Sequence, residues 1–91
     1  MKAVRGPYTT VSRGYEAPRQ FAAVLRPVEH TPSLLAENLY DAMRHHENDG
    51  QRPLSPAAVR RLEVFINAAL PDPLEANQAI WAVQEAGARH G

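Results

Sequence analysis

Three dipeptides of one type divide the chain from residue 31 onward: Thr31-Pro32, Ser55-Pro56 and Asp72-Pro73. In each pair, the first side chain can accept a hydrogen bond from an unpaired backbone N–H at a helix start. The proline that follows has a φ angle already suited to a helix and no N–H to leave unpaired. Glu75 also follows Asp72 at the spacing of a capping box. The pattern therefore predicts three helix starts.

Apolar residues recur three and four positions apart after each start, which is typical of a helix with one buried face. After the first start they are Leu35, Leu39, Ala42 and Met43, with His46 on the same face and Leu34 beside them. After the second they are Val59, Leu62, Phe65, Ile66, Ala69 and Leu70. After the third they are Ala76, Ala79, Ile80, Val83 and Ala86. We predict helices over about 32–47, 56–70 and 73–88.

Short connections join these helices, because residues 48–54 separate the first two and little more than Pro71 separates the last two. Gly50 is the expected stop of the first helix. Short links place successive helices antiparallel or at steep angles. We expect an all-α fold, a compact three-helix unit. The 91 residues suffice for one domain, and with no cysteine the chain has no disulfide to reinforce it.

The first thirty residues have a different pattern. Gly6-Pro7 and Gly14 bracket a short strand-like stretch that has no partner strand, so we predict an extended basic arm over 1–16 and a single helical domain over 17–91. Within that domain, residues 18–25 are expected to form a short extra helix that ends before Pro27. A strand over 20–25 is the competing interpretation.

Ten basic and ten acidic side chains cancel, which argues against binding to nucleic acid or a membrane surface by bulk charge. The balance hides an asymmetry, because residues 1–30 carry a net charge of +3 and residues 31–50 a net charge of −3. Either the arm folds back on the acidic helix or it reaches an acidic partner. No apolar run approaches the roughly 20 residues of a membrane span, so we expect a soluble, cytoplasmic protein.

The stretch 44–50, Arg-His-His-Glu-Asn-Asp-Gly, resembles a metal site at first sight. Metal ligands on one helix need to share a face, and the pairs of ligands four positions apart that include a histidine are Asp41 with His45 and His45 with Asp49. Each pair supplies two ligands, fewer than the three or four that zinc normally requires, so we predict no metal and no cofactor. We interpret the stretch as the last turn of a helix, with His45 near its carbonyl end. If His46 faces inward, charging it at low pH would loosen the helix.

Groups suited to catalysis are missing from the sequence. There is no cysteine, no Gly-x-Ser-x-Gly elbow and no phosphate-binding glycine loop. Carboxylates are spread singly over polar faces, so nothing in the sequence suggests a protonated acid beside an ionised base. We therefore expect a non-enzymatic protein-interaction module, an adaptor or an inhibitor that occupies a partner surface.

Two groups of residues are candidates for contact with a partner protein. In the arm, arginine and tyrosine alternate, a combination enriched at interfaces, although a solvated tail is an equal alternative. Trp81 either flanks the core or faces a partner. The predicted partner-binding residues are Arg5, Tyr8, Arg13, Tyr15, Arg19, Glu37, Asp41 and Trp81.

Nucleic acid or a small phosphorylated ligand is the first alternative partner. The arm could hold phosphates and stack on bases, with Arg60 and Arg61 as further phosphate contacts. A recognition helix is not favoured, because the third helix has no basic residue before Arg89. A structural subunit of a homo-oligomer is the second alternative.

Overall fold

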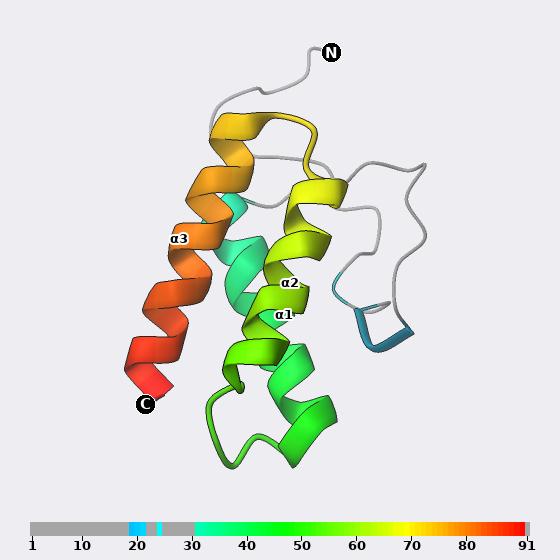
Figure 1. Cartoon of the computed structure of the whole chain (residues 1–91), viewed down its shortest axis with the longest axis vertical. Helices are drawn as coiled ribbons and strands as arrows, with labels where there is room; N and C mark the ends of the chain where they lie inside the picture. Colours follow the sequence, from blue (N-terminus) through cyan, green and yellow to red (C-terminus); the bar gives the residue numbers. More distant parts are fainter. Residues whose placement is uncertain (1–18, 22–23, 25–30, 91) are drawn as a thin grey trace.

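A computed structural model of the chain describes residues 19–21, 24 and 31–90. It contains three α-helices, α1 (Pro32–Asn48), α2 (Pro56–Ala69) and α3 (Pro73–His90), preceded by the 3-10 turn η1 (Arg19–Phe21). The described residues contain no strand. Helices α1 and α3 run in the same direction and α2 runs opposite to both (Figure 1). The predicted all-α fold of three helices is confirmed.

The helix starts are stabilised as the dipeptide pattern predicts. The Thr31 Oγ1 atom accepts a hydrogen bond from the Leu34 N–H at 3.0 Å, and the Ser55 Oγ atom accepts one from the Ala58 N–H at 3.2 Å. The Asp72 Oδ1 atom accepts from the Leu74 N–H at 2.9 Å. Each bond pairs a donor that the first helical turn leaves without a partner. These local bonds fix where each helix begins.

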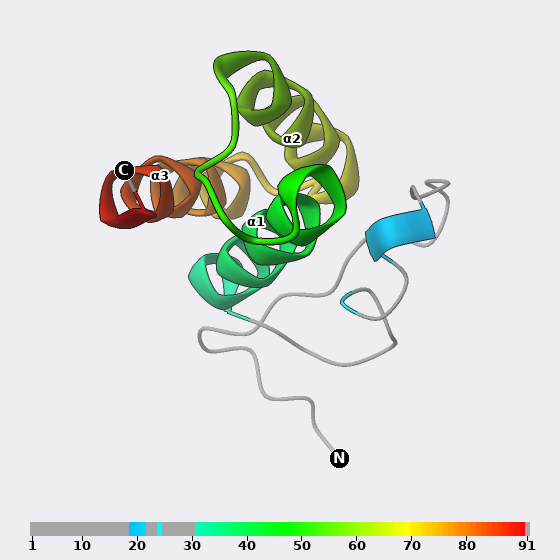
Figure 2. The same ribbon diagram turned by 90° about the horizontal axis from the view of Figure 1, so that it is seen from below.

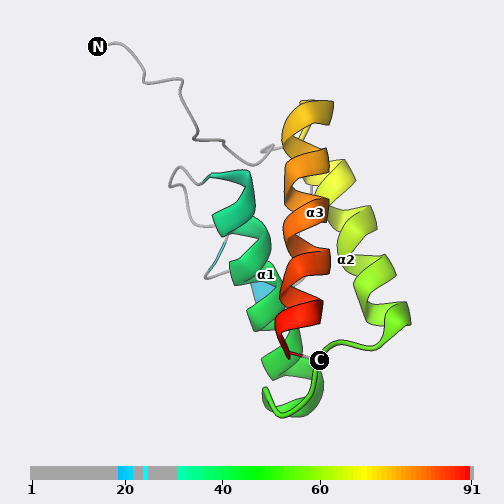
Figure 3. The ribbon, with the colours of Figure 1, turned by 90° about the vertical axis from the view of Figure 1, so that its left-hand side faces the viewer.

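The three helices enclose one core, and their arrangement about it is clearest end-on (Figure 2). The most extensive packing is between α1 and α3, which lie side by side (Figure 3). Only small side chains of α3 are fully buried in this core: Ala76, Ala79, Ala82, Val83 and Ala86. Small side chains on α3 let its axis approach that of α1 closely. The larger side chains of α1 fill the space between the two helices.

The segment before α1 contributes one large side chain to this core. Phe21 in η1 is buried, and its ring lies 4.8 Å from the ring of Phe65 on α2. Residues 19–21 form a helical turn, so the helical interpretation over 18–25 is supported over the strand over 20–25 at Gln20 and Phe21. Most of the remaining predicted helix lies outside the described residues.

The buried face of α1 differs from the predicted one at its C-terminal end. His46 was expected inward, and the structure places it exposed in the last turn. At this level of α1 the contact with α2 is made by Glu47, which pairs with Arg61, and His46 is left on the solvent side. Met43 is the last fully buried residue of α1, and the residues after it are partly buried or exposed. The expected loosening of α1 through His46 at low pH loses its structural basis.

Tyr40 is the principal residue that the predicted stripe omitted. It is 1% exposed, and its hydroxyl oxygen accepts a hydrogen bond from the Leu54 N–H at 3.0 Å. Leu54 is itself buried just before α2. On the α3 side, Gly87 lies near the Tyr40 hydroxyl and the His90 ring stacks on the Tyr40 ring. One side chain thus joins α1, α3 and the connection to α2.

Candidate functional site

The acidic residues of α1 are paired within the chain. Asp41 lies 2.7 Å from the Arg44 guanidinium and 3.7 Å from the His45 ring. Glu37, the other predicted acidic contact, lies 3.7 Å from Arg89 at the end of α3. The Asp41 and Glu37 carboxylates are about half exposed, although Arg44 is only 14% exposed, so each pair contributes little to stability. The pairs nevertheless leave the acidic face of α1 locally balanced, which weakens its role as a contact for a basic partner.

Arg44 also holds the turn that ends α1. Its guanidinium donates a hydrogen bond to the Gly50 carbonyl oxygen. Asp49 and Gly50 both adopt positive φ angles, 59° and 76°, so the left-handed residue that ends the helix is Asp49, one position before the expected Gly50. The His45 ring lies directly over Gly50, where an added Cβ would come within 2.6 Å of it. The histidine-rich stretch is therefore a helix end, as predicted, and its groups make local contacts.

No metal centre is present in the part of the chain that the structure describes. Among residues 19–21, 24 and 31–90, no three His, Cys, Asp or Glu side chains lie close enough together to hold an ion. Nor does any helix among those residues have the length and apolar content needed to cross a membrane.

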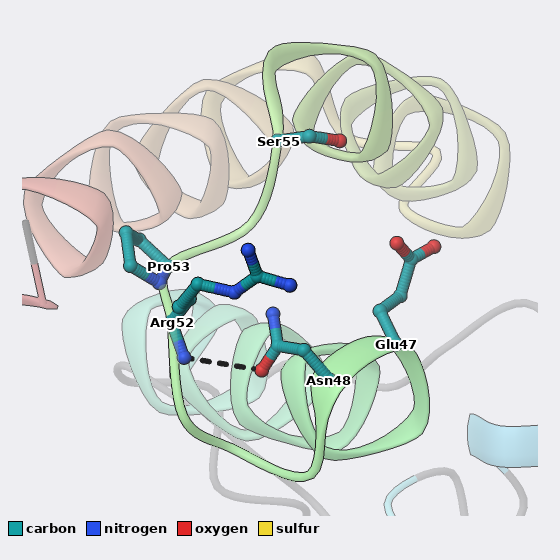
Figure 4. A pocket seen from close by; sticks show the side chains of 5 residues that line it. All are labelled: Glu47, Asn48, Arg52, Pro53 and Ser55. Carbon is teal, nitrogen blue, oxygen red and sulfur yellow. Dashed lines mark hydrogen bonds between the residues drawn. The ribbon is translucent and has the colours of Figure 1, made fainter.

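A small pocket of about 370 Å³ lies between the end of α1 and the start of α2. Its walls carry Glu47, Asn48, Arg52, Pro53 and Ser55 (Figure 4). The Asn48 side-chain oxygen accepts from the Arg52 N–H at 3.2 Å, and the Glu47 carboxylate is paired with Arg61 at 2.7 Å. One carboxylate and one guanidinium on opposite walls select no particular ligand charge, so this pocket does not indicate a function.

The outer side of α3 carries the most exposed large apolar side chains of the described residues. Leu74 is 72% exposed and Trp81 is 67% exposed. At 100° per residue they lie on one line along the helix, opposite the buried Ala79 and Val83. We call Leu74, Gln78, Trp81, Glu85 and Ala88 the α3 stripe; all five residues are exposed.

The indole of Trp81 is held in place on this stripe. Its Nε1–H donates a hydrogen bond to the Glu85 Oε2 atom at 2.8 Å. The bond satisfies the polar end of the ring and leaves the apolar faces open to solvent. Of the two sequence interpretations of Trp81, the structure therefore excludes a position at the edge of the core.

A second exposed line runs along the outer side of α2. Val64 is 63% exposed and lies two residues from the buried Leu62 and Ile66, on the opposite side of the helix. We call Ala57, Arg60, Arg61, Val64 and Ala68 the α2 stripe; all five residues are exposed. The first four line a shallow, open hollow whose walls are mostly apolar.

The two predicted phosphate contacts lie in the α2 stripe but differ in their surroundings. Arg61 is bound to Glu47 through the 2.7 Å ion pair, whereas Arg60 makes no ion pair with another described residue. A phosphate that used both would have to compete with a carboxylate for one of them. The pair therefore offers a phosphate one available cation rather than two.

The predicted contacts do not form one site in the part that the structure describes. Arg19 is exposed in η1, and the arm residues Arg5, Tyr8, Arg13 and Tyr15 lie outside the described residues. Sequence reasoning missed Val64 and Leu74. The available signal was an apolar residue on the polar side of a helix, at the position opposite the buried stripe.

No protein-family model, no curated protein and no solved structure matches this chain. The geometry of its surface is therefore the basis for any functional proposal.

Proposed function

We propose that this protein is a non-enzymatic interaction module, an adaptor or an inhibitor, that occupies a partner surface through the α3 stripe. One observation carries the proposal: Trp81 is 67% exposed, on the side of α3 opposite the core. Leu74 lies two turns away on the same line, about 10 Å along the helix axis. Single exposed apolar residues are common on protein surfaces, but two large ones aligned on one helix face favour a docking surface.

The held position of Trp81 adds to this argument. Binding costs entropy when side chains become ordered at an interface, and a ring already fixed by a hydrogen bond costs less. Tryptophan is also among the residues that contribute most to binding where interfaces have been mutated. The Trp81–Glu85 bond therefore supports Trp81 as an anchor, with Leu74 as a second contact.

A binder of nucleic acid or phosphorylated ligands has weaker support from the described residues. Arg61 is paired with Glu47, and α3 has no basic residue before Arg89. Arg60 alone does not make a phosphate site. The two functions respond differently to salt, because phosphate contacts weaken steeply with ionic strength and an apolar anchor does not.

Affinity capture from a lysate of the native cells tests the proposal, with nucleic acids retained and co-purifying molecules identified by mass spectrometry and by nucleic-acid staining. The baits are the wild-type chain, Trp81→Gln and, as a control, Asn38→Ala, an exposed residue on α1. We expect the same proteins on the wild-type and control baits, retained when salt is raised, and their loss from the Trp81→Gln bait.

The three baits must first give the same circular dichroism spectrum and melting curve, which their exposed positions favour. Identical protein sets on all three baits would contradict a role for Trp81. Nucleic acid that leaves all baits as salt rises would support the alternative function instead.

A further inference from the structure

We propose that the α3 stripe docks on the α2 stripe of a second copy of this chain. The inference rests on the proposed function and names the partner of its docking surface. Its basis is that the chain carries two exposed apolar lines whose charges are complementary. The α3 stripe has a carboxylate, Glu85, and no base, whereas the α2 stripe has two guanidiniums and no acid.

The spacing of the two stripes matches in one orientation. When Val64 of one copy lies against Trp81 of the other and the helices are antiparallel, the residues on the N-terminal side of Val64 also meet α3, while Leu74 lies opposite Pro71, just beyond the end of α2. Ala57 lies seven positions before Val64, and Ala88 lies seven positions after Trp81. In the antiparallel arrangement the two alanines therefore face each other. Small side chains there let the helices approach closely enough for the central pair to pack.

The same register brings the charged groups of the two stripes together. Arg60 precedes Val64 by four positions, and Glu85 follows Trp81 by four, so the two lie opposite each other across the contact. Within its own chain, Arg60 makes no ion pair with a described residue. Glu85 accepts the indole N–H through one carboxylate oxygen, and its other oxygen stays available to a guanidinium.

The parallel orientation lacks this match. With Val64 still against Trp81, the residue four positions after Val64 is Ala68, and it would face Glu85. Arg60 would then face Asn77, so neither charge finds a partner. The antiparallel register is therefore favoured by charge, and it repeats the antiparallel arrangement of α2 and α3 within the chain (Figure 1).

The contact joins two different surfaces, so each copy has one of each. Such a contact closes into a dimer or ring when its rotation permits and otherwise extends the assembly. A single helix pair buries less than the roughly 800 Å² per partner of a standard stable interface. We therefore expect association that depends on concentration, with a dissociation constant in the micromolar to millimolar range.

Sedimentation equilibrium over a concentration series measures this association directly. The variants Val64→Gln and Trp81→Gln each remove one side of the central contact, and Asn38→Ala is the control. We expect each of the two variants to weaken self-association about 30-fold or more, as the loss of an anchoring residue does, and the control to leave it unchanged.

Mixing the two variants gives the decisive measurement. Each alone has no intact contact, but Val64 of the Trp81→Gln chain can still receive Trp81 of the Val64→Gln chain. We expect the mixture to associate more strongly than either variant by itself. Charge reversal gives an independent version: Arg60→Glu and Glu85→Arg should each weaken association alone and restore it when mixed.

Three results would overturn the inference. A wild-type chain that stays monomeric up to about 1 mM rules out the second copy as partner, and leaves the proposed docking of another protein on Trp81 standing. Association that survives both Gln variants lies elsewhere on the surface. Association lost in Trp81→Gln and not restored by mixing indicates that α3 pairs with α3.

Discussion

Tyr40 shows how much one side chain can decide in a small core. Its ring is buried, and its hydroxyl oxygen pairs the N–H of Leu54, which lies in the connection between α1 and α2. The sequence did not reveal this role, because a tyrosine beside an apolar stripe is as consistent with an exposed flank as with the core. The position depends on Leu54, Gly87 and His90, which are distant in sequence.

We expect Tyr40→Phe to lower the free energy of unfolding by about 1–3 kcal/mol, because the buried Leu54 N–H would lose its acceptor while the ring packing remains. Urea unfolding followed by circular dichroism measures the change. Leu39→Val is the control, because it removes one buried methylene and keeps the hydrogen bond between the Leu54 N–H and the Tyr40 hydroxyl. A Tyr40→Phe protein as stable as the wild type would show that water pairs the Leu54 N–H instead.

Substituting alanine for Gly50 and for Gly87 should change the stability of the protein in opposite directions. Gly50 has a φ of 76° and the His45 ring overhead, so Gly50→Ala should destabilise the protein by at least about 1–2 kcal/mol. Gly87 lies inside α3 with Tyr40 at an ordinary contact distance, so Gly87→Ala should stabilise by about 0.5–1 kcal/mol. Thermal melting of both variants tests the contrast.

The double variant His45→Ala with Gly50→Ala separates the two costs at Gly50. Removing the ring relieves the collision and leaves the cost of the positive φ angle. Partial recovery is therefore expected. Full recovery would mean that the φ angle itself costs nothing.

At the scale of elements, the residue at which each helix begins was predictable from the sequence, and the exposure of residues at the helix C-terminal ends was not. A start depends on a cap and a proline within a few residues, and the bonds of Thr31, Ser55 and Asp72 confirm all three. The exposure of His46 depends on how α1 packs against α2 and α3, which no local pattern encodes. For the same reason, sequence identified Trp81 as a candidate contact but could not tell whether it faces the core or solvent.

Ser55→Ala should cost about 0.5–2 kcal/mol, since the Ala58 N–H would lose its side-chain acceptor at the start of α2. Ser55→Asp keeps an acceptor and adds a favourable charge at the helix N-terminus, so it should retain most of the stability. Chemical denaturation of both variants measures the difference. Equal losses in the two would indicate that Ser55 acts through something other than capping.

At the scale of the whole molecule, the core and the outer stripes should be separable by mutation. Phe65 is 4% exposed and lies against Phe21, so Phe65→Ala should cost about 3–5 kcal/mol. Trp81 is a larger residue, but Trp81→Gln should change stability by less than about 0.5 kcal/mol because the ring is exposed. Differential scanning calorimetry of both variants compares them. A large loss in Trp81→Gln would place the indole within the folded core.

Trp81 is also the only tryptophan in the chain, and this has a consequence for how the protein can be observed. Indole fluorescence responds to the water around the ring. Unfolding the core changes the water around the ring little, because the ring is already hydrated in the folded chain. Docking of a partner removes the water and should shift the emission to shorter wavelength. The protein thus carries an intrinsic optical probe that reports binding and is nearly silent on folding.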